Sequence, residues 1–250
     1  MKLIRNLSFI VGLILLWAIG SQYSSPLFLP EPTKVIDSFV ELMKNGMLPE
    51  AVRMSFMRIT TASVISCGIS IPLGLFVSEY KVLDETLTPL TNLMRYIPVT
   101  VFYPLLIMWL GIGEQMKITF LFVATFFFFL PSVILCVKEV NTDLVETAYT
   151  MGMNKFQVMF RVILPYSLPS ICQSFLMMYG IGWTYIIIVE VVNAHAGLGH
   201  LINLGSARGR TDLVFAALLV IMTISWIFDF CGNKLIRWVF AWKFAREIED

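Results

Sequence analysis

The stretch "ETAYTMGMNKFQVMFRVILP", residues 146–165, lies between two long apolar runs of this 250-residue chain. Its apolar residues recur at helical spacing, but polar residues interrupt every turn, so the stretch is too short and too polar to span a bilayer. One glycine, Gly152, divides it, and Leu164-Pro165 closes it. We therefore interpret the stretch as two short helices at a membrane surface, separated by a glycine cap.

The residues around the two helices predict their ends and their faces. Asn141, at the start of an Asn-Thr-Asp cluster, precedes the first helix, and Asn154 precedes the second; both are residue types that cap helix N-termini. We predict an apolar face for each helix, formed by Leu144, Val145, Ala148 and Met151 and then by Phe156, Val158, Met159, Val162 and Ile163. Ala148 and Gly152 are expected to face the cytosol, where small residues allow a partner's backbone to approach closely.

The composition places this stretch in a membrane protein. Hydrophobic residues make up 58% of the chain and charged residues only 14%, against about 45–50% and about 25% in soluble domains. The net charge of +1 gives no basic field that would attract nucleic acid. A soluble core cannot hide this excess of apolar residues, so we expect an all-α membrane protein.

Six apolar runs are long enough to be considered as spans. They cover residues 7–23, 57–78, 97–113, 117–137, 168–192 and 212–236. Lys and Arg are more frequent on the side that would hold both termini, so the positive-inside rule predicts an N-in, C-in topology. The basic start followed by an apolar run reads as a retained first span, not as a cleaved signal peptide.

Three segments outside the spans have features of their own within a single transmembrane domain, residues 1–250. Residues 24–56 predict an outside interfacial helix, a turn at Asn45-Gly46 and a second helix that leads into the second span. Residues 138–167 form the longest inside loop, which contains the opening stretch. Residues 193–211 form a glycine-rich outside loop, expected to carry one short helix.

The spacing within the inside loop resembles the EAA signature of ABC importer permeases. Glu146-Thr147-Ala148 is followed after three residues by Gly152, and after nine more by Val162-Ile163-Leu164-Pro165. The sequence departs from that signature at Thr147 and Val162. The stretches "IPLGLFVS", "YIPVTVFYPLLIMWLGIGE" and "GIGWTYIIIVEVVNAHAGLGHLI" look like those of permeases for nitrate, sulfonate, taurine and bicarbonate.

This resemblance implies an importer-type permease bundle in a bacterial cytoplasmic membrane. The inside loop would be the coupling helix that docks on a cytoplasmic ATPase, through Glu146, Thr147, Ala148, Gly152, Val162, Leu164 and Pro165. The implied partners are a second permease copy in a homodimer, two ATPase subunits that bind ATP and Mg, and a substrate-binding protein outside. The substrate would be a small anion, or alternatively another small organic nutrient such as a vitamin precursor.

Polar residues at membrane depth are candidates for the translocation path, because weak contacts permit release of the substrate. The candidates are Arg58, Tyr96, Thr100, Tyr103, Thr184, Tyr185, Glu190 and Asn193. Each has a second interpretation as a packing or interfacial residue; for Glu190 that interpretation is a hydrogen bond to a loop amide. Glu79 and Arg95 are expected at the inner ends of the second and third spans.

The sequence gives little support to an enzyme. It has no phosphate-binding G-x-x-x-x-G-K-[ST] loop, so ATP hydrolysis is assigned to a separate subunit and no cofactor is expected in this chain. His195 and His200 have no carboxylate or cysteine partner at metal-ligand spacing, so no metal site is expected. A stand-alone transporter, the remaining alternative, predicts inverted repeats and clustered ionisable residues at mid-membrane, and neither is visible.

Overall fold

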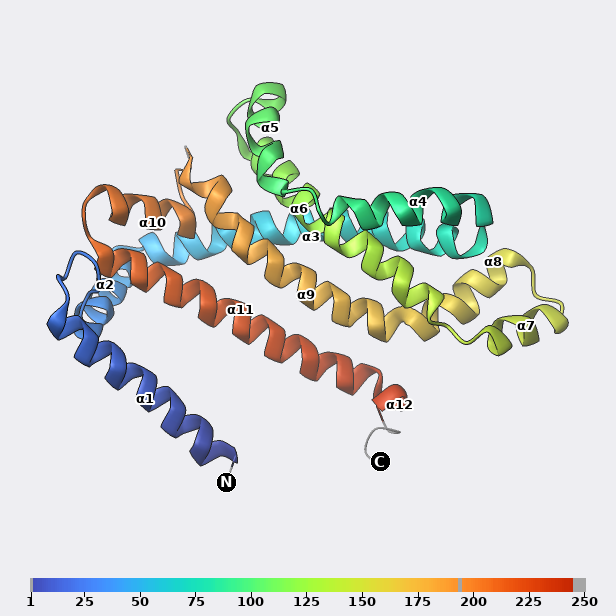
Figure 1. Ribbon diagram of the computed structural model, residues 1–250, viewed down its shortest axis with the longest axis horizontal. Coiled ribbons are helices and arrows are strands. Elements are labelled where there is room, and N and C mark those ends of the chain that lie inside the picture. The colour runs from blue at the N-terminus through green and yellow to red at the C-terminus, as the bar shows by residue number, and fades with distance from the viewer. Residues whose placement is uncertain (1, 193–194, 245–250) are drawn as a thin grey trace. The chain divides into compact units, whose positions relative to one another are not determined.

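The computed structural model describes residues 2–192 and 195–244, and all regular structure in these ranges is helical (Figure 1). This confirms the all-α fold. In chain order the elements are α1 (Lys2–Tyr23), α2 (Pro32–Lys44), α3 (Met47–Glu79), α4 (Lys81–Met94), the 3-10 turn η1 (Val99–Val101), α5 (Phe102–Leu110), α6 (Glu114–Lys138), α7 (Thr142–Thr150), α8 (Lys155–Val158), the π-helical turn η2 (Met159–Ile163), α9 (Leu164–Val191), α10 (Leu198–Ala207), α11 (Thr211–Val239) and α12 (Ala241–Phe244).

The chain forms two compact units. Unit 1 contains residues 1–56 and 186–224, and unit 2 contains residues 57–185 and 225–250. The three long helices α3, α9 and α11 each contribute residues to both units.

Four helical stretches in the described ranges are long and apolar enough to cross a membrane. They cover 47–79, 114–138, 155–191 and 211–239; they contain the second, fourth and sixth predicted spans and all but the last residue of the fifth. The first predicted span lies in α1, which contains the apolar stretch Val11–Tyr23. The exact number of spans and the N-in, C-in topology remain predictions.

The third predicted span belongs to a bent pair of helices, which corrects the sequence analysis. Residues 81–94 and 99–110 form two helical segments at 83° to each other, and together they qualify as one broken span. Sequence analysis assigned no helix to 81–94, because its charged residues and Pro89 interrupt the apolar pattern. The break has a local cause: Pro98 disfavours helical backbone at the residue before it, so α4 ends at Met94.

The core of unit 2 includes contacts among α3, α4, α6 and α9, and α3 contributes small buried residues to it. Ala62, Ser63, Ser66 and Ser70 are fully buried and recur at helical spacing along α3. Small residues at such positions let neighbouring helices approach closely, as is common in membrane bundles. Large buried side chains of α6 and α9 complete this core: Phe120, Phe129, Met178, Tyr179 and Trp183.

Unit 1 holds the predicted features of both outside segments. The helix α2 ends at Lys44, and the chain turns at Asn45-Gly46, where Gly46 has a positive φ of 72°. The following helix is continuous with the second span, and α10 is the short helix predicted within 193–211. The helix α1 packs on α11 through stacked rings of Trp17 and Phe215, whose centroids lie 5.8 Å apart.

Candidate functional site

The loop that resembles a coupling helix has the two predicted N-terminal caps. The side chain of Asn141 accepts a hydrogen bond of 2.8 Å from the amide of Asp143 at the start of α7. Asn154 and Gln157 form a reciprocal capping box at the start of α8, with hydrogen bonds of 3.0 and 2.9 Å. The sequence therefore determines where both short helices begin.

The end of α7 confirms the predicted glycine cap. Gly152 has a φ of 83°, in the left-handed region that favours glycine. Its amide donates to the carbonyl of Tyr149 at 2.9 Å, and the amide of Met153 donates to the carbonyl of Ala148 at 3.1 Å. This pair of hydrogen bonds is a Schellman motif, which turns the chain sharply out of α7 and towards α8.

Ala148 does not face outward as the sequence analysis expected. It is only 5% exposed and packs in a core cluster with Val137, Val158 and Ile163. Each predicted apolar face is in fact divided between the core and the surface, because a short amphipathic helix has more apolar residues than one packed side can bury. On α7 the residues Val145 and Ala148 pack inward, while Leu144 and Met151 are exposed.

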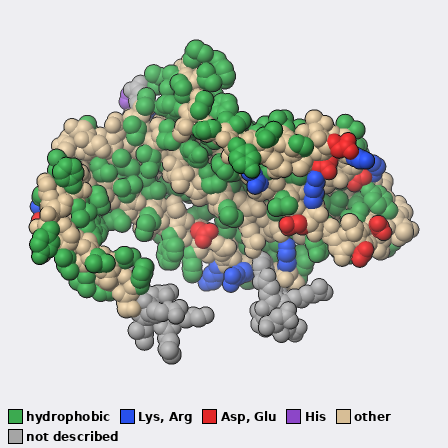
Figure 2. Space-filling model, viewed as in Figure 1, with side chains coloured by type: hydrophobic (Ala, Val, Ile, Leu, Met, Phe, Trp, Pro, Cys, Tyr) green, Lys and Arg blue, Asp and Glu red, His purple; other side chains and the backbone are tan. Residues whose placement is uncertain are grey.

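Exposed apolar side chains remain on the outer side of this loop. Met151 is 75% exposed and Phe156 57% exposed, and Leu144 and Phe160 are also on the surface. We call these four residues the loop patch. Figure 2 shows acidic and basic side chains over the part of unit 2 that holds α4, α7 and α8, and the exposed Glu146, Lys155 and Arg161 are close to the patch in sequence. An apolar patch with polar surroundings is typical of a protein-binding surface.

Behind the loop lies a cleft of about 510 Å³ in unit 2. Its lining comes from α3, α4, α6 and α7 and includes Ser78, Glu79, Asp84, Lys138, Val145 and Glu146. Two of the acidic residues have basic partners, since Lys138 contacts Asp84 and Lys155 lies 3.4 Å from Glu79. Glu146 is exposed and makes no ion pair with another described residue.

Tyr149 connects α7 to the end of α3. Its hydroxyl donates to Glu79 at 2.8 Å. Burial, and then this hydrogen bond to a carboxylate, raises the pKa of Tyr149 to about 12. The hydroxyl therefore stays protonated at physiological pH and remains a donor that holds α7 against α3.

Of the other coupling candidates, two pack against the core cluster and two are exposed. Val162 and Leu164 are half-buried and pack on the same core cluster as Ala148. Thr147 and Pro165 are exposed, and the Thr147 hydroxyl donates to the carbonyl of Asp143 at 2.6 Å. The signature thus combines residues that shape the loop with residues that a partner could contact.

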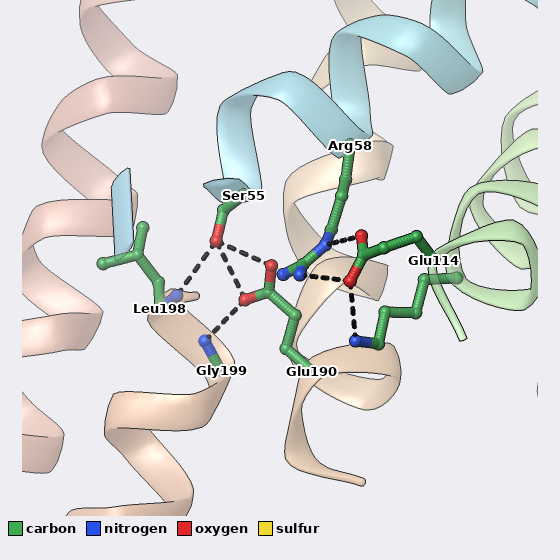
Figure 3. Close-up of polar contacts among 7 residues, drawn as sticks. Ser55, Arg58, Glu114, Glu190, Leu198 and Gly199 are labelled. Atoms are coloured by element: carbon green, nitrogen blue, oxygen red, sulfur yellow. Dashed lines mark hydrogen bonds and ion pairs between the residues drawn. The ribbon is translucent and has the colours of Figure 1, made fainter. Parts of the chain in front are cut away.

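A cluster of charged residues in unit 2 includes the path candidate Arg58. This arginine is only 3% exposed and binds both carboxylate oxygens of Glu114, each at 2.7 Å (Figure 3). Lys117, also buried, donates to the same carboxylate at 3.0 Å. A bidentate arginine–carboxylate pair fixes both partners in orientation, so Arg58 joins α3 to the start of α6.

Glu190, the second charged path candidate, is fully buried in unit 1. Its carboxylate accepts hydrogen bonds from the Ser55 hydroxyl, 2.8 Å from each oxygen, and from the amide of Gly199 at 2.9 Å (Figure 3). Ser55 in turn accepts from the amide of Leu198 at 2.9 Å. The carboxylate therefore joins three elements of unit 1: α3, α9 and α10.

The remaining path candidates have different environments. Tyr103 and Tyr185 both contact the ring of Phe120 edge-on, so the structure brings these two residues to one place. Tyr96 is 81% exposed at the break after α4, and Thr100 is exposed on η1.

Thr184 is exposed, and its hydroxyl donates to the carbonyl of Ile181 within the same helix. Asn193 lies outside the described residues.

Sequence reasoning missed the partners of the two buried charges. Ser55 is 135 residues from Glu190, and Arg58 is 56 residues from Glu114, so no local pattern links them. One pattern in the sequence could have indicated the partner of Arg58. Glu114 and Lys117 are two charged residues, three positions apart, at the start of a span, where an unpaired charge is costly.

A protein-family comparison matches residues 70–240 to "Binding-protein-dependent transport system inner membrane component". The chain is 29% identical to a putative ABC transporter permease of Methanocaldococcus jannaschii, over 97% of this chain and 93% of that one. It is 29% identical to the taurine transport system permease of Escherichia coli K12, over 90% and 84%. It is also 27% identical to the riboflavin transport system permease of Chloroflexus aurantiacus, over 90% and 87%.

The fold is similar to that of a solved transporter structure. A chain of the methionine ABC transporter in an inward-facing conformation aligns with a TM-score of 0.70, covering 77% of this chain and 96% of that one. The sequence identity is 22%, so this similarity bears on the fold alone.

Proposed function

This chain belongs to the family of inner-membrane components of binding-protein-dependent transport systems, and we propose that it carries a small anion across the bacterial cytoplasmic membrane. As a permease subunit of an ABC importer it is not itself catalytic, and its partners are an ATPase and a substrate-binding protein. ATP and Mg are then bound by the ATPase subunits. Two copies of this chain form the path between them, because one chain supplies one coupling loop and an ATP-bound pair of ATPases engages two.

The coupling role is inferred mainly from the loop patch, which lies on a rigidly held part of the structure. The capping box and the Schellman motif fix the loop's shape, and the core cluster around Ala148 holds it against α6 and α9. Met151 and Phe156 then present apolar surface that no described residue covers. A rigid, apolar projection can transmit the movement of a docked ATPase to the helices behind it.

Coupling also assigns a role to Glu146. Its carboxylate is exposed beside the cleft behind α7 and has no basic partner among the described residues. A buried or half-buried arginine of the ATPase would supply that partner on docking, and a charge-assisted pair of this kind adds orientation as well as affinity.

The anion assignment rests on similarity to relatives and on the chemistry of the path candidates. The taurine permease of E. coli is one relative, whereas the riboflavin permease of C. aurantiacus represents the alternative, an organic nutrient. Exposed neutral donors at Tyr96 and Thr100 can contact an anion weakly enough to release it.

Co-purification tests the coupling role. The permease is expressed with the ATPase and captured through a tag on the permease, and the ATPase retained is measured for the wild type and for Met151→Glu with Phe156→Glu. We expect the double variant to lose most of its ATPase while its thermal unfolding stays close to that of the wild type. Ile36→Glu with Phe39→Glu, at two exposed apolar residues of α2 in unit 1, provides a matched apolar-to-acidic control. Full retention by the variant with Met151→Glu and Phe156→Glu would contradict the assignment.

A further inference from the structure

A second, smaller cavity in unit 2 contains an arginine. Its volume is about 210 Å³, and it is lined by Arg95, Phe128, Ser132, Ser174, Met177, Met178 and Ile181. The lining comes from the end of α4 and from the facing sides of α6 and α9. Arg95 is its only charged lining residue, and no carboxylate lines it.

The cavity opens against the side of α6, and Arg95 reaches it from the break between the two segments of the bent pair. The Arg95 Nη2 atom donates to the Ser132 hydroxyl at 3.3 Å. Ser132 precedes Lys138, the last residue of α6, by six residues, which corresponds to about 9 Å along the helix. An ionisable side chain held against an apolar helix of spanning length is by default a functional candidate.

The local structure accounts for the charge of Arg95 only in part. Arg95 is the C-cap of α4, where the helix dipole stabilises a cation. That interaction does not use the donors of the guanidinium, which has five N–H groups. Among the described residues Arg95 forms one hydrogen bond and no ion pair, so most of its donors are available.

The rest of the lining suits a small anion that also carries a short apolar group. Ser174 adds a hydroxyl, 3.5 Å from the Cys136 sulfur, and Met177 and Ile181 add apolar wall. Arg95 and Met177 are exposed, so water and solutes reach the cavity from one side. An open site with one cation binds an anion reversibly, because solvent screens the charge.

We propose that Arg95, with Ser132 and Ser174, forms a contact point for a small oxyanion such as a sulfonate in the translocation path. This inference rests on the proposed transport function and adds to it the residue that selects for negative charge. Arg95 is a binding residue in this scheme. The fork of the guanidinium matches two oxygens of a sulfonate or carboxylate group, which a lysine ammonium matches less well.

Charge-selective labelling of the assembled permease–ATPase complex tests the proposal. Ser174→Cys is introduced after the four native cysteines, Cys67, Cys136, Cys172 and Cys231, are replaced. The rate of modification is measured with the anionic reagent sulfonatoethyl methanethiosulfonate and with its cationic trimethylammonium analogue. The first reagent is itself an alkyl sulfonate, so the ratio of the two rates reports how strongly the cavity attracts the proposed class of ligand.

We expect Arg95→Gln to lower the anion-to-cation rate ratio by about tenfold, because a unit charge a few ångströms away is removed. Arg95→Lys should retain most of the ratio, and Arg237→Gln, an exposed arginine of α11 outside the cavity, should leave it unchanged. Millimolar taurine should slow the anionic reagent in the presence of Arg95 but not in Arg95→Gln.

Two results would overturn the proposal: a ratio that Arg95→Gln does not change, or a Ser174→Cys side chain that neither reagent modifies. Neither result bears on the transport function, which the retention of the ATPase by the same complexes tests separately.

Discussion

The backbone amide of Gly199 donates a 2.9 Å hydrogen bond to the buried carboxylate of Glu190, nine residues earlier. A Cβ at position 199 would lie 2.7 Å from the Glu190 Cβ and 3.0 Å from the Ile187 carbonyl oxygen, so only glycine permits this approach. Together with Ser55, this contact fixes the start of α10 to the end of α9. The outside loop is therefore positioned by a buried charge.

Replacing Glu190 should loosen this loop. In Glu190→Ala the Ser55 hydroxyl and the Gly199 amide lose their acceptor inside the protein, at a cost of about 2–3 kcal/mol in the free energy of unfolding. We expect faster tryptic cleavage after Arg208, an exposed residue that follows α10. Glu50→Ala, an exposed carboxylate of α3, is the control. Equal cleavage rates in the two variants would show that Glu190 does not hold the loop.

The Arg58–Glu114 pair should show a measurable coupling energy. A double-mutant cycle of Arg58→Met and Glu114→Gln, followed by thermal unfolding in detergent, is expected to give about 1–2 kcal/mol, because the pair is bidentate and Arg58 is buried. Lys81 and Glu85, an exposed pair four residues apart on α4, should give a value near zero. Additive effects at Arg58 and Glu114 would show that their contact contributes no stability of its own.

The two arginines of the outside loop should have different roles. Arg208 is exposed, whereas Arg210 forms ion pairs with Glu41 at 2.9 Å and Asp212 at 2.8 Å. We expect Arg208→Glu to weaken the docking of the binding protein, more strongly at low salt. The measurement is ATPase activity stimulated by the binding protein; an unchanged response at low salt would show that Arg208 does not contact the binding protein.

Arg210→Glu should act on structure instead, by repelling Glu41 and Asp212. The hydrogen bond from Arg210 lowers the pKa of Glu41, so the pair contributes above the ordinary pKa of a glutamate and is lost as the pH falls through the lowered value. Tryptic cleavage after Lys44, at the end of α2, should increase in Arg210→Glu at neutral pH, and amide hydrogen exchange of α2 should show loosening of the wild type only in acid, below the lowered pKa of Glu41. Unchanged cleavage in Arg210→Glu would exclude this role.

The sequence predicts the long helices other than α4 and the caps of the inside loop, but not which side chains meet. The caps at Asn141, Gly152 and Asn154 depend on neighbours within a few residues, so local rules identify them. The outward position of Ala148 was wrong because burial on a short amphipathic helix depends on the element packed against it.

The contrast between local features and contacts of distant residues also applies to the charged residues. The hydrogen bond between Glu190 and a loop amide was one of two interpretations from the sequence, yet Ser55 as the second partner was not predictable. Arg95 was placed at the end of a span, because the helix α4 before it was not recognised. Its position in a cavity follows from the bend at Pro98, which brings the end of α4 against Ser132 of α6.

Gly152 allows the shape of the coupling loop to be tested apart from its contacts. A Cβ there would meet no atom within 4 Å, so a substitution strains the backbone at φ 83° without a clash. Gly152→Ala should destabilise the chain by about 1 kcal/mol, and Gly152→Asn should cost less, because asparagine tolerates left-handed backbone. Thermal unfolding of the purified permease measures both.

Docking of the ATPase should depend on Gly152 in a different order. Alanine and asparagine project from an exposed position that follows Met151 directly, and aspartate also adds a negative charge to the loop. We expect retention of the ATPase on immobilised permease to fall in the order wild type, Gly152→Ala, Gly152→Asn, Gly152→Asp. The Gly152→Asn variant is then more stable than Gly152→Ala but retains less ATPase. Transport in proteoliposomes should follow docking and not stability. If retention followed the order of stability instead, Gly152 would only shape the loop, and no partner would approach it closely.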